Sequence, residues 1–109
     1  MILALDIHDA LYIFIDTGDA ERELEAIDVQ EDRFEFCDAA GQPYIPEYTR
    51  LPKRSSLSVD IGSFMLRREG DIKADLPERF IQRARHIEHS SITSLTDIET
   101  LLLELHRGA

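Results

Sequence analysis

The chain has 109 residues, of which 43% are hydrophobic and 31% charged, and its formal net charge at pH 7 is -10. This composition excludes wholesale disorder, and the length suits a single domain over residues 1–109 that buries roughly two thirds of its unfolded surface. Nucleic acid is not an expected partner, because phosphate binding depends on clustered Lys and Arg and only two lysines occur, Lys53 and Lys73.

The negative charge is confined to the first half of the chain. Residues 1–50 contain 13 acidic residues and three arginines, a balance of -10, whereas residues 51–109 contain nine acidic and nine basic residues. Such asymmetry repels polyanions and steers cationic partners toward one region of a protein. We therefore expect an acidic binding surface rather than an active site.

The single cysteine and the N-terminal segment bear on localisation. Cys37 has no second cysteine to pair with, which excludes an internal disulfide and fits a reducing compartment. The apolar residues 1–5 lack a basic lead and end at Asp6, far short of a signal core or a membrane span. The sequence predicts a cytoplasmic protein that does not insert into a bilayer.

A strand and an acidic helix are the first predicted elements. Residues 11–15 form a β-branched and aromatic run that suits a central strand buried on both faces, whereas residues 2–7 are either an edge strand or a flexible lead. A helix is expected over residues 19–27, where apolar residues recur at helical spacing and acidic residues fill the outer face.

A hairpin and a proline-rich segment follow. Two phenylalanines alternate with polar residues over 33–38, and Gly41 closes the predicted hairpin into residues 44–45. Three prolines then make residues 42–56 an irregular or edge segment and the expected mobile loop, because proline cannot donate to a strand ladder.

Another strand and a helix are predicted next. The strand begins at residue 57, and its apolar phase shifts after Gly62, which fits a bulge. Residues 75–78 combine an N-cap acid with an early proline, a pattern typical of a helix start. The buried face of this helix would be lined by Leu76, Phe80, Ala84 and Ile87.

A last helix is expected over residues 94–106, with Ser94 and Asp97 as its capping box. Its apolar surface is unusually wide, because Leu101 and Leu103 lie beside the stripe that would face the core. Either this helix is deeply buried between other elements, or these two leucines contact another chain, as in a homodimer.

The tripeptide Asp16-Thr17-Gly18 also occurs in retroviral-type aspartic proteases. In those enzymes two chains each supply one carboxylate to a pair that activates water. Against a protease, the chain has only five glycines and a C-terminal part of helical pattern, and a strand-to-helix turn capped by Thr17 or Asp19 explains the same residues. We predict no enzymatic activity and keep a dimeric protease, with Asp16 of each subunit sharing a proton, as a distant alternative.

No metal or cofactor is expected. His86 and His89 could approach one metal from a helix, but a zinc site needs three or four ligands and no third ligand is suitably spaced, so a solvated helix end explains the pair. Residues 28–35 are acid-rich but lack the central glycine of a calcium loop. Cys37 lacks an activating base, and the neighbouring Glu35 disfavours the thiolate.

The basic residues of the second half have three possible roles. Arg79, Arg83 and His86 form a basic stripe on the predicted helix, and Arg67 and Arg68 add a second positive pair. They form an anion site, or they offset the acidic half within the same molecule or simply solvate their helix. The second role would reduce the acidic binding surface.

The acidic cluster itself either keeps a small protein soluble or recognises a partner. Carboxylates on a rigid helix and hairpin raise the association rate with a basic partner and can occlude a cationic cleft. The predicted contact residues are Asp19, Glu21, Glu23, Glu25, Glu31, Asp32 and Glu35.

A family resemblance supports recognition. Glu-Arg-Glu-Leu-Glu-Ala-Ile-Asp-Val over residues 21–29, Phe-Glu-Phe over 34–36 and Asp-Ala-Ala-Gly over 38–41 follow the predicted strand. Over residues 11–41 the chain thus resembles small acidic bacterial immunity-type proteins, which are encoded beside polymorphic toxins. The resemblance implies a protein that neutralises a basic effector or toxin by direct binding.

Together these patterns predict an α+β domain with a small, mostly antiparallel sheet, helices covering one face and the element order β-α-β-β-β-α-α. The expected function is that of a non-enzymatic, cytoplasmic binding protein. A small acidic secretion-type chaperone is the alternative, which would hold an effector through apolar faces. High salt distinguishes the two, because it weakens an electrostatic inhibitor and spares a hydrophobic chaperone.

Overall fold

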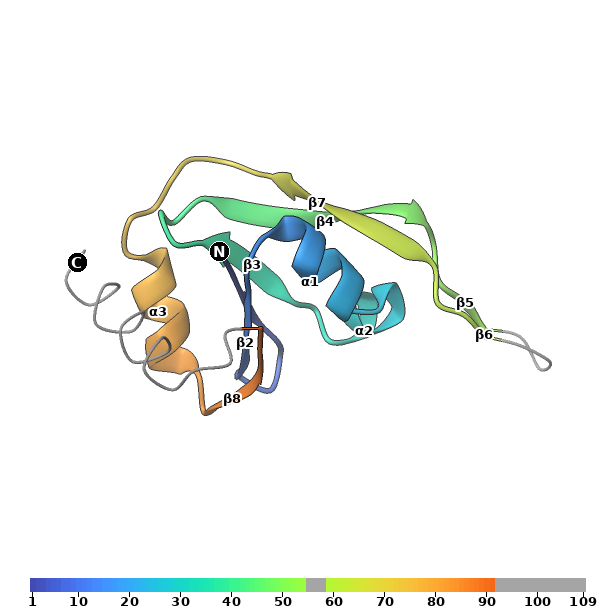
Figure 1. Cartoon of the computed structure of the whole chain (residues 1–109), viewed down its shortest axis with the longest axis horizontal. Coiled ribbons are helices and arrows are strands. Elements are labelled where there is room, and N and C mark those ends of the chain that lie inside the picture. Colours follow the sequence, from blue (N-terminus) through green and yellow to red (C-terminus); the bar gives the residue numbers. More distant parts are fainter. Residues whose placement is uncertain (55–58, 92–109) are drawn as a thin grey trace.

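The computed structural model describes residues 1–54 and 59–91 and consists of a six-stranded sheet, a short two-stranded ribbon and three helices (Figure 1). In chain order the elements are β1 (Ile2–Leu5), β2 (Ala10–Phe14), α1 (Thr17–Glu23), α2 (Ala26–Glu31), β3 (Glu35–Asp38), β4 (Pro43–Arg50), β5 (Lys53–Arg54), β6 (Val59–Asp60), β7 (Ser63–Arg68), α3 (Leu76–Arg83) and β8 (His86–Ser90). The sheet has the order β7-β4-β3-β1-β2-β8, and only β2 and β8 pair in parallel. The predicted α+β class with a mostly antiparallel sheet is confirmed.

The N-terminal strand β1 lies in the middle of the sheet, between β3 and β2. Residues 2–5 are therefore neither an edge strand nor a flexible lead. All four are buried, because side chains alternate across a strand and here both faces are covered. The predicted central strand at residues 11–15 is confirmed as β2.

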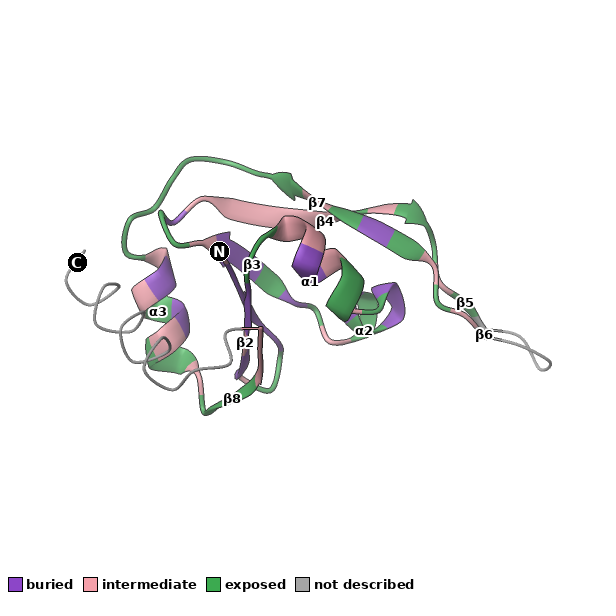
Figure 2. Ribbon diagram, viewed as in Figure 1, coloured by how far each residue is buried: buried purple, intermediate pink, exposed green. Residues whose placement is uncertain are grey.

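Helices cover both faces of the sheet, so the predicted covering of one face is wrong. Ile2 and Ala4 of β1 pack in a cluster with residues of α1 and α2. Leu3 and Leu5 point the other way and pack with Phe80 of α3. Figure 2 shows that buried residues gather in β1 and β2, between α3 on one side and α1 and α2 on the other.

The predicted helix over residues 19–27 is two short helices, α1 and α2, separated at Leu24, whose backbone is extended. In one continuous helix Ala26 would lie about 120° around the axis from Ala20. The break brings both alanines, together with Val29, into the same core cluster. Burial of apolar side chains thus overrides the helical continuity that the spacing predicts.

The hairpin of β3 and β4 closes at Gly41 as predicted, but the proline-rich residues 43–50 form a regular strand rather than an irregular segment. Pairing with β3 ends at Tyr44, which lies opposite Phe36. A backbone N–H at the position of Pro46 would point to the same side of β4 as that of Tyr44, toward β3. Because the pairing with β3 has already ended, such an N–H would have no partner there. A strand therefore tolerates this proline without losing a ladder bond.

The strands β4 and β7 continue beyond the rest of the sheet as an arm that ends in the ribbon of β5 and β6 (Figure 1). Gly62 separates β6 from β7 with a φ of 71°, and a Cβ at this position would collide with the Arg50 carbonyl. The phase change predicted at Gly62 is therefore a bend between two strands. The register irregularity lies opposite, between Tyr48 and Arg50 of β4.

The helix predicted from residue 75 is confirmed as α3, with Pro77 in its first turn and Phe80 buried. It ends at Arg83, and Ile87 belongs to β8 with 41% of its surface exposed, so its predicted place on the buried helix face is wrong. The last predicted helix, residues 94–106, lies outside the described residues, as do the proposed contacts Leu101 and Leu103.

Candidate functional site

Asp19 is a structural residue rather than a surface contact. Only 7% of its surface is exposed, and its Oδ2 accepts a hydrogen bond of 3.0 Å from the Ile15 N–H. A hydrogen bond with the Ser91 side chain lowers the pKa of Asp19, with smaller help from Ile15 and Arg22 and opposition from burial. This carboxylate supports the start of α1 and is not available to a partner.

Glu21 is also engaged within the molecule. Its Oε2 accepts a hydrogen bond of 2.8 Å from the backbone N–H of Leu66 in β7. Because β7 is an edge strand of the sheet, this carboxylate satisfies an N–H group that has no neighbouring strand. The side chain ties α1 to the sheet, and it too is removed from the set of predicted contacts.

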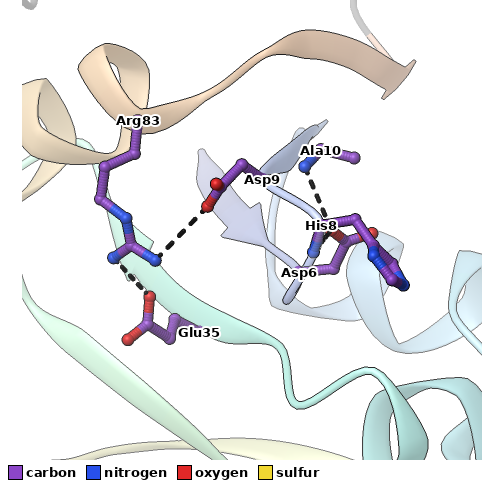
Figure 3. A network of polar contacts seen from close by, with 6 residues as sticks. All are labelled: Asp6, His8, Asp9, Ala10, Glu35 and Arg83. Carbon is purple, nitrogen blue, oxygen red and sulfur yellow. Dashed lines mark hydrogen bonds and ion pairs between the residues drawn. The ribbon is translucent and has the colours of Figure 1, made fainter.

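Glu35 belongs to a charged cluster at one end of the sheet (Figure 3). Arg83 at the end of α3 lies 2.9 Å from Glu35 and 3.6 Å from Asp9, which is in the turn between β1 and β2. These contacts connect α3 to β3 and to that turn. The prediction that arginines offset the acidic half within the molecule is confirmed for Arg83.

Two further arginines also lie beside carboxylates, although not all of these carboxylates belong to the acidic half. Arg67 pairs with Glu47 at 3.5 Å and with Glu69 at 3.6 Å. Arg79 pairs with Asp75 at 3.0 Å, one helical turn away. Three of the residues that suggested an anion site, Arg67, Arg79 and Arg83, are thus held beside carboxylates.

Asp6 is a buried carboxylate that the sequence analysis did not identify as important. It is 6% exposed and accepts hydrogen bonds from the His8 N–H at 2.8 Å and the Ala10 N–H at 3.1 Å (Figure 3). The Tyr12 hydroxyl donates a third bond at 3.2 Å, and burial together with the Asp6 charge raises the pKa of Tyr12 to about 12. The sequence signal that could have identified Asp6 is the presence of an acidic residue in a short turn between two apolar strands.

Other carboxylates are exposed at the end of α1 and along α2. Glu23, Glu25 and Asp28 are exposed, and their side chains contact no partner within residues 1–54 and 59–91. Glu31 is also exposed, and Glu25, Asp28 and Glu31 follow one another at intervals of three residues, which places them on one side of α2. We call Glu23, Glu25, Asp28 and Glu31 the acidic corner.

The acidic corner differs from the predicted set of seven contacts. It keeps Glu23, Glu25 and Glu31 and adds Asp28. Asp32, at the end of α2, is half-buried, and its carbonyl accepts a bond of 3.1 Å from the Ile7 N–H. The predicted surface is therefore smaller than the sequence suggests, and it is carried by two helices rather than by a helix and a hairpin.

A cleft lies beside the acidic corner, between the helices and the arm. It is lined by Glu21, Arg22, Leu24, Glu25, Ala26, Ile61, Gly62, Ser63 and Phe64. A second groove opens where β4 runs past the start of β3, lined by Phe34, Glu35, Phe36, Pro43, Tyr44, Ile45, Pro46, Lys73, Leu76 and Phe80. Glu35 and Lys73 are the charged residues of the second groove, whereas Glu21, Glu25 and Arg22 are those of the first.

His86 and His89 lie on β8 and not on a helix end. His86 Nε2 lies 2.7 Å from Glu88, and His89 lies 3.3 Å from the Ser91 hydroxyl and against the Phe14 ring. In the part of the chain that the structure describes, no three His, Cys, Asp or Glu residues are grouped closely enough to hold a metal ion. Among the same residues, no helix is long and apolar enough to span a membrane.

The tripeptide Asp16-Thr17-Gly18 forms the strand-to-helix turn into α1. Asp16, rather than the predicted Thr17 or Asp19, is the cap, because its Oδ1 accepts a hydrogen bond of 2.7 Å from the Asp19 N–H. Cys37 is fully buried in β3, and burial, assisted by the charges of Asp38 and Glu35, raises the pKa of its thiol to about 12.

Comparison with protein-family models, with curated proteins and with solved structures finds no match for this chain.

Proposed function

We propose that this chain is a non-enzymatic binding protein of the immunity type, which neutralises a basic effector or toxin by direct contact with the acidic corner. The observation that carries the proposal is the separation of the carboxylates into two groups. Asp16, Asp19, Glu21 and Glu35 have hydrogen-bonding or ionic partners inside the molecule. Glu23, Glu25 and Asp28 have none among the described residues.

Unpaired carboxylates such as Glu25 and Asp28, which lie three residues apart on α2, cost stability through self-repulsion, because like charges at helical spacing repel by a few tenths of a kcal/mol per pair. A cationic partner removes that repulsion and is attracted over a distance of about 8–10 Å at physiological salt. The two helices that carry the cluster pack on the core through Ala20, Ala26 and Val29, so the carboxylates are presented on a supported surface.

The test compares two variants of equal net charge. In the first, Glu23→Gln, Glu25→Gln and Asp28→Asn neutralise the acidic corner. In the control, Glu47→Gln, Asp71→Asn and Glu88→Gln neutralise three exposed acids outside it. The ligand is the basic domain of an effector encoded by a neighbouring gene, and the measurement is its dissociation constant at 50 and 300 mM NaCl.

We expect the corner variant to bind at least about tenfold more weakly at low salt and to show a flatter salt dependence, because each lost ion pair contributes up to about 1 kcal/mol. The control should bind like the unmodified chain. Equal losses in the two variants would mean that only net charge matters, and unchanged binding in both would refute the proposal.

A secretion-type chaperone is the second candidate, and exposed apolar residues on the arm favour it. Ile61 and Met65 are 43% and 58% exposed, and Leu51 is exposed nearby. Binding that persists at 300 mM NaCl and is lost on replacing Met65 with serine would support this candidate over the acidic inhibitor.

A further inference from the structure

The cleft between the acidic corner and β7 combines apolar and acidic groups. Leu24 and Ile61 supply most of its apolar surface, the buried Ala26 and Phe64 line it as well, and Glu21 and Glu25 supply carboxylates. Two of its charged residues already have partners, because Glu21 accepts from the Leu66 N–H and Arg22 lies 3.8 Å from Asp19. Glu25 is the lining carboxylate that contacts no described residue.

The same cleft borders an open strand edge. The N–H of Leu66 points away from β4, since it donates to Glu21. N–H groups alternate between the two sides of a strand, so the N–H of Phe64 also points away from β4. No residue within 1–54 or 59–91 accepts from it, and Phe64 lines the cleft.

We infer that this cleft is the docking site for an extended segment of the partner protein that carries an arginine. The aliphatic part of the arginine lies on Leu24 and Phe64, its guanidinium pairs with Glu25, and the backbone of the segment pairs with the open edge at Phe64. The inference rests on the proposed function, because it assumes a basic partner, and it adds the site and the mode of recognition.

The geometry favours arginine for physical reasons. A long side chain with an apolar stem and a charged head matches a cleft that is apolar at Leu24, Ile61 and Phe64 and acidic at Glu25. An extended backbone can donate to and accept from an edge strand, which gives affinity that does not depend on sequence. Charge and shape therefore select the same kind of ligand.

The direct test uses the full chain and two synthetic peptides, acetyl-Thr-Val-Arg-Val-Thr-amide and the same peptide with citrulline in place of arginine. Citrulline keeps the shape of arginine and removes its charge. In ¹⁵N-resolved NMR titrations, we expect the arginine peptide to shift the amide signals of Leu24, Glu25 and Phe64 and to bind about fivefold more tightly than the citrulline peptide.

Glu25→Gln should weaken binding of the arginine peptide to the level of the citrulline peptide and leave the latter unchanged. Glu88→Gln, which removes an exposed acid on β8, is the matched control and should change neither. Equal affinity for the two peptides, or shifts confined to residues outside the cleft, would overturn the inference.

A second measurement separates failure of the cleft from failure of the proposed function. Ile61→Ser removes an apolar wall of the cleft, whereas Glu23→Gln with Asp28→Asn changes the acidic corner outside the cleft. Weaker binding of the basic effector domain by Ile61→Ser supports the cleft. Loss only in the Glu23 and Asp28 variant overturns the cleft and leaves the proposed function standing, and no loss in either variant overturns both.

Discussion

The carboxylate of Glu21 accepts a hydrogen bond of 2.8 Å from the backbone N–H of Leu66, 45 residues further along the chain. This contact joins α1 to the edge strand β7 and closes one position of that edge. An acidic residue that the charge pattern assigns to a partner is therefore part of the fold. The same distinction separates the engaged Glu21 from Glu23, Glu25 and Asp28 of the acidic corner, whose side chains form no hydrogen bond or ion pair with the residues that the structure describes.

Replacing Glu21 with alanine should lower the free energy of unfolding by about 1–2 kcal/mol, because a charge-assisted hydrogen bond is lost and the Leu66 N–H is left without its partner. Glu21→Gln keeps an acceptor and should cost less. Urea denaturation checks both values, with Glu23→Ala as the control, which should change stability by less than about 0.5 kcal/mol. Equal effects of Glu21→Ala and Glu23→Ala would contradict the assigned role.

Local patterns in the sequence predicted several elements of the fold correctly. A few neighbouring residues are enough to predict the apolar run of β2, the alternation in β3, the turn at Gly41 and the start of α3 at Leu76. Neighbouring residues do not predict that helices cover both faces of the sheet, because this depends on which face of β1 meets α3. Pairing of the short strand His86–Ser90 with β2 likewise overrides the helical spacing that Ile87 suggested.

The candidate site could be predicted only in part. Local charge density identified Glu23, Glu25 and Glu31 correctly as exposed acids on the early helices. It could not reveal that Asp19 or Glu35 is engaged, since the residues that bond them, Ser91 and Arg83, are distant in sequence. The cleft was also beyond prediction, because its two walls come from α1–α2 and from the arm.

Gly41 should be far less tolerant of substitution than Gly70. Both have positive φ, 90° and 74°, but a Cβ on Gly41 would collide with the Lys73 carbonyl, whereas a Cβ on Gly70 would have no neighbour within 4 Å. Gly70→Ala should therefore cost about 1 kcal/mol from backbone conformation alone, and Gly41→Ala about 2–4 kcal/mol. Thermal unfolding of the two variants is the measurement, and similar losses would contradict the close approach at Gly41.

Asp19 should make the free energy of unfolding of the domain depend on pH in the acidic range. Its pKa in the folded state lies below the ordinary value of 3.8, so its ionised form is favoured by folding. The stabilisation is complete above that ordinary value and is lost as the pH falls through the folded pKa. Asp19→Asn should thus be less stable than the unmodified chain at pH 7, by about 1–2 kcal/mol, and this difference should shrink below pH 4.

The measurement for Asp19 is denaturant unfolding of Asp19→Asn and of the unmodified chain between pH 2.5 and pH 7. The quantity followed is the difference between their free energies of unfolding at each pH. Glu25→Gln serves as the control, because the Glu25 side chain is exposed and forms no hydrogen bond or ion pair with the described residues. A difference between Asp19→Asn and the unmodified chain that stays constant over the whole range would contradict the lowered pKa.

Cys37 should be unreactive in the folded protein. Its thiol is fully buried in β3, and burial raises its pKa from 9.0 to about 12, so the thiolate fraction at pH 8 falls by about a thousandfold before access is considered. Iodoacetamide at pH 8 should therefore leave native Cys37 unmodified over hours and alkylate it within minutes in guanidinium chloride. Mass spectrometry provides the readout, and an exposed thiol introduced by Thr49→Cys in a Cys37→Ser background shows that the reagent is active. Rapid alkylation of native Cys37 would mean that β3 opens far more readily than its buried position between β1 and β4 implies.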